Sequence, residues 1–259
     1  MNIPLDRKLV VALACRNQGT RLYGKPLQNL NIEKNISVID NVIQCLGNID
    51  CIDDIVLGIA EGNENISYVD YSKEKNLTYI IGDETDVLQR LILSGDKAGA
   101  TDIFRTTSES PFPCFEFIQK VWDYHNTHML DATFFDDVID GCGFEIIRLD
   151  ALKKAHKEGE DRHRSEFCTL YIRENIEKFR VRKYLTPEEF HRRDLRLTVD
   201  NPEDLVVCRA VYNNFFDEAP MIPLSKIIKF LDSNPSLKNL IEPFTEKGYE
   251  TMYIWNSSE

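Results

Sequence analysis

Cations and glycines alternate in one short stretch that directly follows an apolar run. Leu9 to Ala14 is apolar, and the residues after it, CRNQGTRLYGK, contain Arg16, Arg21 and Lys25 together with two glycines. Glycine lets backbone N–H groups approach a ligand closely, while arginine and lysine neutralise phosphate charge. The stretch is therefore a candidate polyphosphate-binding loop. A solvated basic loop without function is the alternative that it leaves open.

Two acidic residues follow apolar runs much farther along the chain. Glu109 lies in FRTTSESPF, and Asp200 lies in TVDNPED. Mg²⁺ prefers a few carboxylate oxygens together with water and substrate phosphate oxygens. Two acids that converge beside a phosphate loop would therefore form a metal-dependent nucleotide site. Each acid also has an ordinary explanation, Asp200 as the N-cap of a helix and Glu109 as a solvated loop residue.

The elements expected to position these residues alternate between strand and helix in the first half of the chain. Short apolar runs predict buried strands at 9–14, 54–60, 78–81 and 102–106. Helical spacing predicts helices at 38–46, 64–75, 86–98 and from 115 onward, the first with Ser37 as its N-cap. This alternation is typical of an α/β fold with a doubly wound, mostly parallel sheet. Such sheets bind ligands outside the carboxyl ends of their strands, where the loops after Ala14 and Thr106 are expected.

The second half has a mixed pattern. We expect strands at 132–136, 144–147, 179–185 and 196–199, and helices at 149–157, 166–172 and from Pro202 onward. A helix at 225–232, a further short helix after Pro235 and a strand in the terminal run YETMYIW complete the expectation. No linker, repeat or low-complexity segment divides the chain, which predicts a single domain over 1–259 with a small mixed β/α insertion.

Composition excludes several functional classes. The net charge of −12 argues against a general binder of nucleic acid or of anionic membranes, because both need a broad basic field. The seven cysteines show no CxxC spacing and predict reduced thiols rather than disulfides or zinc ligands. The N-terminal residues show no signal-peptide pattern, and no apolar run approaches the length of a membrane span. We therefore expect a cytoplasmic protein.

Six stretches resemble, in order, the motifs of the cytidylyltransferases that activate acidic sugars and related precursors of surface polysaccharides. The phosphate loop resembles A-R-x-x-S-x-R-L-P-G-K, with Arg16, Arg21 and Lys25 in register. GDETDVLQR, RTTSESP, DGCGFE, EFCTLYIR and LTVDNPED resemble the motifs that follow it. The spore-coat-polysaccharide type is the most similar variety, and the 3-deoxy-manno-octulosonate (KDO) and sialate cytidylyltransferases are more distant. The resemblance extends from about Leu9 to about Tyr212.

The resemblance implies a Rossmann-like nucleotidyltransferase fold that binds CTP and Mg²⁺ and transfers CMP to a small anionic acceptor, with release of pyrophosphate. It implies catalytic roles for Arg16, Arg21 and Lys25, and metal ligation by Glu109 and Asp200. It implies a nucleotide site that also includes Leu13, Ala14, Cys15, Gly19, Asp86 and Ser108. It implies an acceptor site of Gly141, Glu145, Arg164, Glu166 and Tyr171. We expect the region at about 132–195 to form the acceptor side and the contact of a homodimer.

Two departures from the motifs concern the substrates. Glu109 stands where the motif has aspartate, and Phe167 stands where histidine is usual. The acceptor could present a sugar hydroxyl or a phosphate oxygen. A glycosyltransferase that uses a ready-made nucleotide sugar is one alternative function, although Asp136-Asp137 is a poor substitute for its acidic D-x-D motif. A nucleotide-binding module without catalysis is the other.

The remaining reactive side chains favour structural roles. Cys15 lies in the phosphate loop without a histidine nearby, which favours a packing residue over a catalytic thiol. His163 lies in a charged run that predicts a solvated loop, and a contact with an anionic acceptor is the alternative. His125 and His128 have no partner at metal-site spacing, so we expect no zinc. Five phenylalanines in the middle of the chain are expected in the core; these are Phe112, Phe115, Phe117, Phe134 and Phe135.

Overall fold

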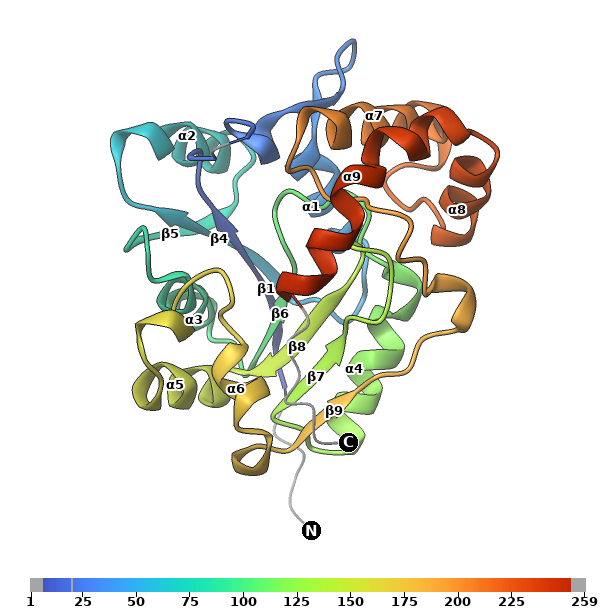
Figure 1. Cartoon of the computed structure of the whole chain (residues 1–259). Coiled ribbons are helices and arrows are strands. Elements are labelled where there is room, and N and C mark those ends of the chain that lie inside the picture. The colour runs from blue at the N-terminus through green and yellow to red at the C-terminus, as the bar shows by residue number, and fades with distance from the viewer. Residues whose placement is uncertain (1–6, 20, 253–259) are drawn as a thin grey trace.

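A seven-stranded sheet runs through the centre of the molecule. The computed structural model describes residues 7–19 and 21–252 of the chain. The strands of the sheet lie in the order β5-β4-β1-β6-β8-β7-β9 (Figure 1). Only β8 is antiparallel to its neighbours, β6 and β7. Their bounds are β1 Leu9–Cys15, β4 Asp54–Ala60, β5 Thr78–Gly82, β6 Asp102–Arg105, β7 Ala132–Phe135, β8 Phe144–Arg148 and β9 Val181–Lys183.

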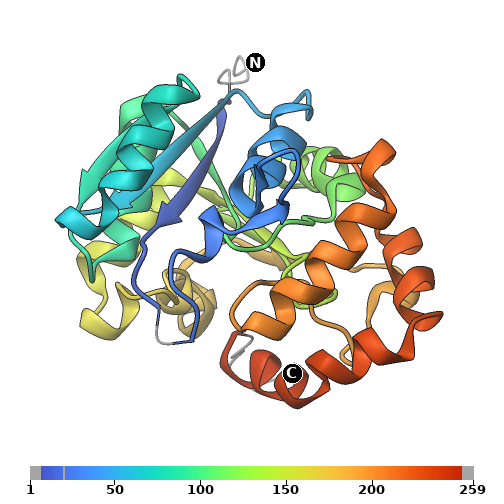
Figure 2. The same cartoon turned by 90° about the horizontal axis from the view of Figure 1, so that it is seen from above.

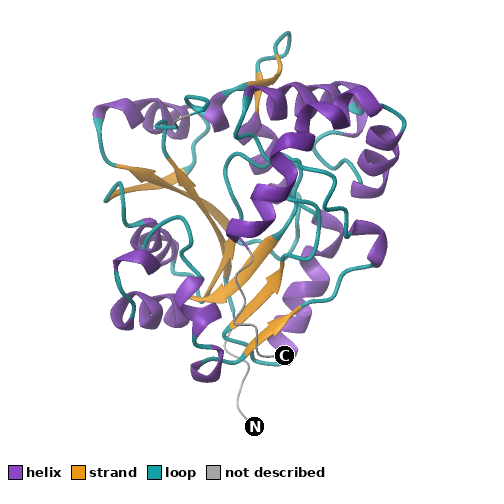
Figure 3. Cartoon of the chain, viewed as in Figure 1, coloured by secondary structure: helices purple, strands orange, loops and turns teal. Residues whose placement is uncertain are grey.

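Helices cover both faces of the sheet (Figure 2). One face is packed by α1 Val38–Gly47, α2 Ile66–Glu74, α4 Ile118–Thr127, α7 Pro202–Asn214, α8 Leu224–Asp232 and α9 Pro235–Met252. The other face is packed by α3 Val87–Ala98, α5 Leu149–Glu158 and α6 Leu170–Glu174. A small hairpin of β2 Asn29–Asn31 and β3 Ile36–Ser37 lies outside the main sheet (Figure 3).

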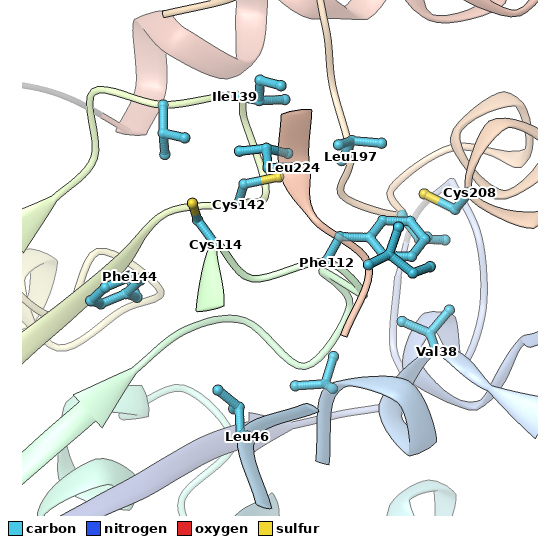
Figure 4. Packing of buried hydrophobic residues seen from close by; sticks show 14 of the residues in the cluster. Val38, Leu46, Phe112, Cys114, Ile139, Cys142, Phe144, Leu197, Cys208 and Leu224 are labelled. Atoms are coloured by element: carbon cyan, nitrogen blue, oxygen red, sulfur yellow. The ribbon is translucent and has the colours of Figure 1, made fainter. Parts of the chain in front are cut away.

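Strand β1 shows why the sheet is covered on both sides. Its alternate side chains enter two separate hydrophobic clusters, Leu9, Val11 and Leu13 on one face and Val10 and Ala12 on the other. A strand buried on both faces is apolar throughout, as this one is, because each face needs its own apolar residues. The larger cluster continues beyond the sheet edge, where Phe112, Cys142 and Leu197 bring three distant loops together (Figure 4).

The predicted α/β fold is confirmed, and most of the expected elements form. Ser37 caps α1 in a capping box with Asp40, so the predicted N-cap is confirmed. The expected phenylalanine core is also confirmed, because Phe112, Phe134 and Phe135 are buried and Phe115 and Phe117 pack against the larger hydrophobic cluster.

Three expectations about elements were wrong. Residues 196–199 form no strand; Arg196 makes a single bridge with Asp140, and its side chain is held by ion pairs instead. Residues 249–252 continue helix α9 rather than forming a strand, and 253–255 lie outside the described residues. The helix expected at 166–172 begins only at Leu170. Within the described ranges, no helix is long and apolar enough to cross a membrane.

Candidate active site

A cleft of about 930 Å³ opens at the carboxyl ends of β1 and β6. The phosphate loop, the loop after β6 and the segment before α7 all contribute to its wall. The sequence-predicted residues among those that line it are Ala14, Arg16, Gly19, Arg21, Lys25, Ser108, Glu109, Glu166 and Asp200. The fold therefore brings the cationic loop and both candidate metal ligands to one cleft.

The phosphate loop is fixed at Asn17. The Asn17 side chain donates hydrogen bonds to the Glu64 carbonyl and the Ser67 hydroxyl, and its backbone N–H donates to Asn65 at 2.7 Å. The Gly24 N–H returns to the Asn17 carbonyl at 3.0 Å, with Gly24 at φ +56°. A side chain at this positive φ would be strained, which explains the glycine. Asn17 was not singled out from the sequence, and a polar residue inside the loop was the only signal.

Close approach explains the second glycine of the loop. A Cβ at Gly19 would lie 2.5 Å from the Leu22 carbonyl oxygen, a distance that backbone atoms cannot easily relieve. The loop is therefore tightly folded, while Arg16 and Arg21 remain exposed at its surface.

The two acids are joined through the backbone. The Val199 N–H donates to the Glu109 carbonyl at 3.0 Å, so the segment that carries Asp200 lies directly against the segment that carries Glu109. The Ser108 hydroxyl donates to the Ala14 carbonyl at 2.8 Å and ties the same loop to the end of β1. Two acids that are about 90 positions apart in sequence thus face one space.

The two carboxyl groups differ in their electrostatic surroundings. Burial raises the pKa of Glu109, and the charge of Asp200 raises it further against the opposing effect of Lys25. Burial also acts to raise the pKa of Asp200, but Lys25, Arg196 and Arg21 together hold that pKa below its usual range. Lys25 Nζ lies 2.5 Å from Asp200, and the nearest Arg21 nitrogen lies 3.6 Å away. The phosphate-loop cations Lys25 and Arg21 therefore partly neutralise the charge of Asp200.

Arg196 connects the acidic residues around Asp200 through ion pairs. Its buried guanidinium pairs with Asp140 at 2.5 Å, with Asp204 at 3.2 Å and, through a short contact, with Asp200. Burial raises the pKa of Asp140 to about 6, although Arg196 lowers it. Arg196 was not predicted from the sequence as a site residue.

The donor set fits Mg²⁺. Glu109 and Asp200 offer carboxylate oxygens to the same cleft, and a cation between them would relieve the repulsion that raises the pKa of Glu109. In the part of the chain that the structure describes, no group of three or more histidine, cysteine or acidic side chains could hold a metal alone. The remaining ligands would have to be water and substrate phosphate.

A smaller side pocket adjoins the cleft and shares Arg105, Glu166 and Phe167 with it. Gly141 and Glu145, both predicted acceptor residues, line this pocket. Glu145 accepts hydrogen bonds from Arg173 at 2.6 Å and from Thr169 at 2.8 Å. Burial acts to raise the pKa of Glu145, but the charges of Arg105 and Arg173 hold it below its usual range.

Several predicted site residues do not line the cleft or the side pocket. Leu13 and Cys15 are buried in the core, and burial raises the pKa of the Cys15 thiol to about 12, which agrees with a packing role. Asp86 caps α3 and pairs with His156 at 2.7 Å. Tyr171 donates to Glu158 at 2.9 Å.

Two more residues of the charged run at 161–165 also differ from expectation. Arg164 contacts Asp161 and the His156 carbonyl rather than either pocket. His163 is buried and pairs with Glu174 at 2.9 Å, so the predicted solvated histidine was wrong. Arg162 also pairs with Glu174, so the turn at 161–163 packs against the end of α6 although its sequence is highly charged.

Comparisons with known proteins place the chain among similar folds. No protein-family model matches it. It is 28% identical over 243 residues to an uncharacterized protein of Methanocaldococcus jannaschii, covering 93% of this chain and 98% of the relative. It is 26% identical over 237 residues to the spore coat polysaccharide biosynthesis protein SpsF of Bacillus subtilis, covering 88% of this chain and 95% of the relative.

Two solved structures have folds similar to that of this chain. A cytidylyltransferase from Leptospira borgpetersenii superposes with a TM-score of 0.79 at 21% identity, covering 89% of this chain and 96% of that one. A CMP:2-keto-3-deoxy-manno-octonic acid synthetase solved with CTP superposes with a TM-score of 0.60 at 12% identity, covering 80% and 99%. The predicted resemblance to the spore-coat-polysaccharide type and the predicted Rossmann-like nucleotidyltransferase fold are confirmed.

Proposed function

We propose that this chain uses CTP and Mg²⁺ to transfer CMP to a small anionic acceptor, with release of pyrophosphate. The observation that carries the proposal is the backbone link between the Glu109 and Asp200 segments, in a cleft that also contains Arg16, Arg21 and Lys25. Similarity to SpsF supports a role in surface polysaccharide or glycoconjugate synthesis.

The cleft suits in-line displacement at the α-phosphorus. An acceptor oxygen forms a bond to that phosphorus while the bond to the leaving pyrophosphate breaks. Arg16, Arg21 and Lys25 would neutralise the triphosphate, and this neutralisation and alignment supply most of the acceleration. No covalent intermediate with the protein is required.

The metal ion would be held by Glu109 and Asp200. When bound, Mg²⁺ polarises the phosphate oxygens and offsets charge on the leaving group. Lys25 and Arg21 contact Asp200 and line the same cleft, so both cations would be in place to bind the triphosphate beside this carboxylate.

CTP is the nucleotide to test first, because the synthetase of similar fold was solved with it. The acceptor is expected in the side pocket, where Arg105 is one-fifth exposed and provides a cation beside Glu166. A carboxylate or phosphate on the acceptor would pair with this guanidinium.

A pyrophosphate-release assay tests the proposal. CTP, UTP, ATP and GTP are each combined with Mg²⁺ and a panel of acidic sugars and phosphorylated sugars, polyols and metabolites. Release that requires both CTP and an acceptor is expected, and a panel without any release from CTP contradicts the proposal.

Lys25→Ala tests the phosphate loop. The variant is expected to lose at least about 100-fold in rate, because one well-placed donor to a transition-state oxyanion contributes roughly that factor. Lys153→Ala is the control, since Lys153 pairs with Asp96 on the surface. Near-normal turnover in Lys25→Ala would remove this residue from the mechanism.

A further inference from the structure

Phe244 brings an aromatic ring into the cleft from helix α9. It lies beyond Tyr212, where the resemblance to the cytidylyltransferase motifs ends. The ring lines the cleft together with the phosphate loop and both candidate metal ligands. The side chain is only partly buried, so some of its surface is open to a ligand. The resemblance assigns no role to this residue.

The apolar face of α9 explains how the ring reaches the cleft. Leu237, Ile241 and Phe244 lie four and then three positions apart, which places them on one face of the helix. Ile241 is fully buried in the larger hydrophobic cluster, and Leu237 packs against that cluster. Among the residues that the structure describes, neither hydrophobic cluster includes Phe244. The apolar face therefore continues from the core to the wall of the cleft.

Helix α9 lies at the side of the molecule far from β4 and β5. Two views show it across β1 from these strands (Figures 1 and 2). It packs against α7 and α8, and α7 begins two residues after Asp200. Phe244 therefore lies on the Asp200 side of the cleft. Phe167 is the other phenylalanine in the cleft wall, and it also lines the side pocket where the acceptor is expected.

The ring of Phe244 is unusual in its surroundings. Most of the other side chains that line the cleft are charged or carry a hydroxyl or amide group. An ordered water needs about two to four polar partners, and a phenyl ring offers it none of the usual donors or acceptors. The same ring offers apolar contact to the carbon skeleton of a small molecule. The position therefore favours an organic acceptor over water.

We propose that Phe244 is a specificity residue that keeps water from replacing the acceptor. The inference rests on the proposed function, because it concerns the nucleophile of that reaction. In the transfer, an acceptor oxygen bonds to the α-phosphorus while the bond to pyrophosphate breaks. Water in the same position would give CMP and pyrophosphate and release a proton to the solvent. An apolar wall excludes water from the reacting atoms and suppresses this hydrolysis.

Two rates measured on the full chain with CTP and Mg²⁺ test the proposal. One is the formation of CMP and pyrophosphate without an acceptor, and the other is the formation of the CMP-acceptor product with the active member of the acceptor panel. The native protein is expected to hydrolyse CTP slowly relative to transfer.

Phe244→Ala removes the ring. The ratio of hydrolysis to transfer is expected to rise by about tenfold or more, since even one methylene of apolar contact changes selectivity by about that factor. The KM for the acceptor should rise more than the KM for CTP. Phe244→Leu keeps an apolar side chain, so its ratio should stay close to that of the native protein. A rise in hydrolysis cannot come from unfolding, because an unfolded chain has no cleft.

Leu240→Ala is the matched control. Leu240 lies on the same helix, is 39% exposed and does not line the cleft. This variant is expected to keep the native ratio. If Phe244→Ala fails to fold, Phe244→Val, which leaves part of the apolar surface in place, is judged by the same ratio against the same control.

Several outcomes would overturn the proposal. A native ratio in Phe244→Ala would do so and leave the proposed function intact, provided that the native protein transfers CMP. An equal rise in Phe244→Leu would show that apolar cover is not what excludes water, and an equal rise in Leu240→Ala would make the effect a general one of α9. If the native protein releases no pyrophosphate with any acceptor, the proposed function is refuted and this inference with it.

Discussion

The Glu109 carboxyl group is placed where its charge is unfavourable. Burial raises its pKa, and Asp200 adds repulsion that Lys25 only partly offsets. An acid whose pKa is raised by folding destabilises the folded state once it ionises, so stability is lost as the pH rises from the ordinary glutamate value toward the raised one. Functional sites commonly retain such groups because the ligand uses their charge.

Glu109→Gln tests this conflict. At pH 8 the free energy of unfolding of the variant is expected to be about 1 kcal/mol higher than that of the native protein. The variant is also expected to lose Mg²⁺-dependent pyrophosphate release. The gain should vanish near pH 4, where Glu109 is itself protonated. Denaturant unfolding at both pH values measures it, and exposed Glu33→Gln serves as the control. A less stable variant at pH 8 would contradict the assigned charge conflict.

Sequence patterns predicted the cations of the phosphate loop better than the buried charged side chains. Arg16, Arg21 and Lys25 stand out because cations after an apolar strand are unusual in an acidic chain. Arg196 lies between Leu195 and Leu197 in a pattern that fits a strand. Nothing in such a pattern shows that a charged side chain is buried, because its burial depends on acids that come from distant segments.

The start of helix α7 depends on one buried ion-pair cluster. Asp204 accepts hydrogen bonds from the backbone N–H groups of Asp200 and Asn201, and it pairs with Arg196 on its other side. Arg196 therefore connects the helix N-terminus to Asp140 and to the cleft acid Asp200.

Arg196→Met is expected to lower the free energy of unfolding by about 3–5 kcal/mol, because it leaves buried carboxylates without their counterion. Arg192→Met is the matched control. Arg192 pairs with Asp194 and Asp232 at the surface, where such pairs contribute about 1 kcal/mol or less. Urea unfolding measures both, and similar losses in the two variants would contradict the central role of Arg196.

At the scale of elements, strands and helices with strong periodicity were predictable and the extended segments were not. The apolar runs of β1 and β4 and the cap at Ser37 follow from local sequence alone. Polar and apolar side chains alternate at 196–199 as they do in a strand. The segment is nevertheless held by the ion pairs of Arg196 rather than by a ladder of backbone hydrogen bonds. The terminal run YETMYIW is rich in aromatic residues, but α9 has already begun at Pro235 and continues through 249–252, since extending a helix is easier than starting a strand.

A second buried polar network lies far along the sheet from the cleft, at the amino ends of β1 and β6. Asp102 accepts hydrogen bonds from Arg7 and Thr101 and contacts His125 at 3.1 Å. The other ring nitrogen of His125 lies 2.7 Å from the Thr133 hydroxyl. The network joins the segment before β1, helix α4 and strands β6 and β7 in the folded chain.

This network makes the stability of the whole molecule pH-dependent. Burial lowers the pKa of His125, which outweighs the opposing effect of Asp102. Below about pH 6.5, His125 is therefore protonated in the unfolded chain but still neutral in the folded chain. The free energy of unfolding consequently decreases as the pH falls from about 6.5 toward the lowered pKa. The loss attributable to one such histidine is at most about 1.4 kcal/mol per pH unit.

His125→Gln is expected to show a shallower decline in the free energy of unfolding between about pH 7 and pH 5 than the native protein. His128→Gln, three positions away and exposed, should decline as the native protein does. Urea unfolding at a series of pH values measures all three. Parallel declines in the native protein and His125→Gln would exclude His125 as the responsible group.

The backbone hydrogen bond from Val199 to Glu109 has a consequence for directed evolution of the protein. Because the N–H and the C=O belong to the main chain, a library that varies the side chain at 109 keeps both groups of this hydrogen bond, whereas Val199 is buried in the core and is better left unchanged. Acids of different reach can thus be compared at 109. Proline at 199 is the exception among the standard amino acids, since it removes the donor that holds the segments together.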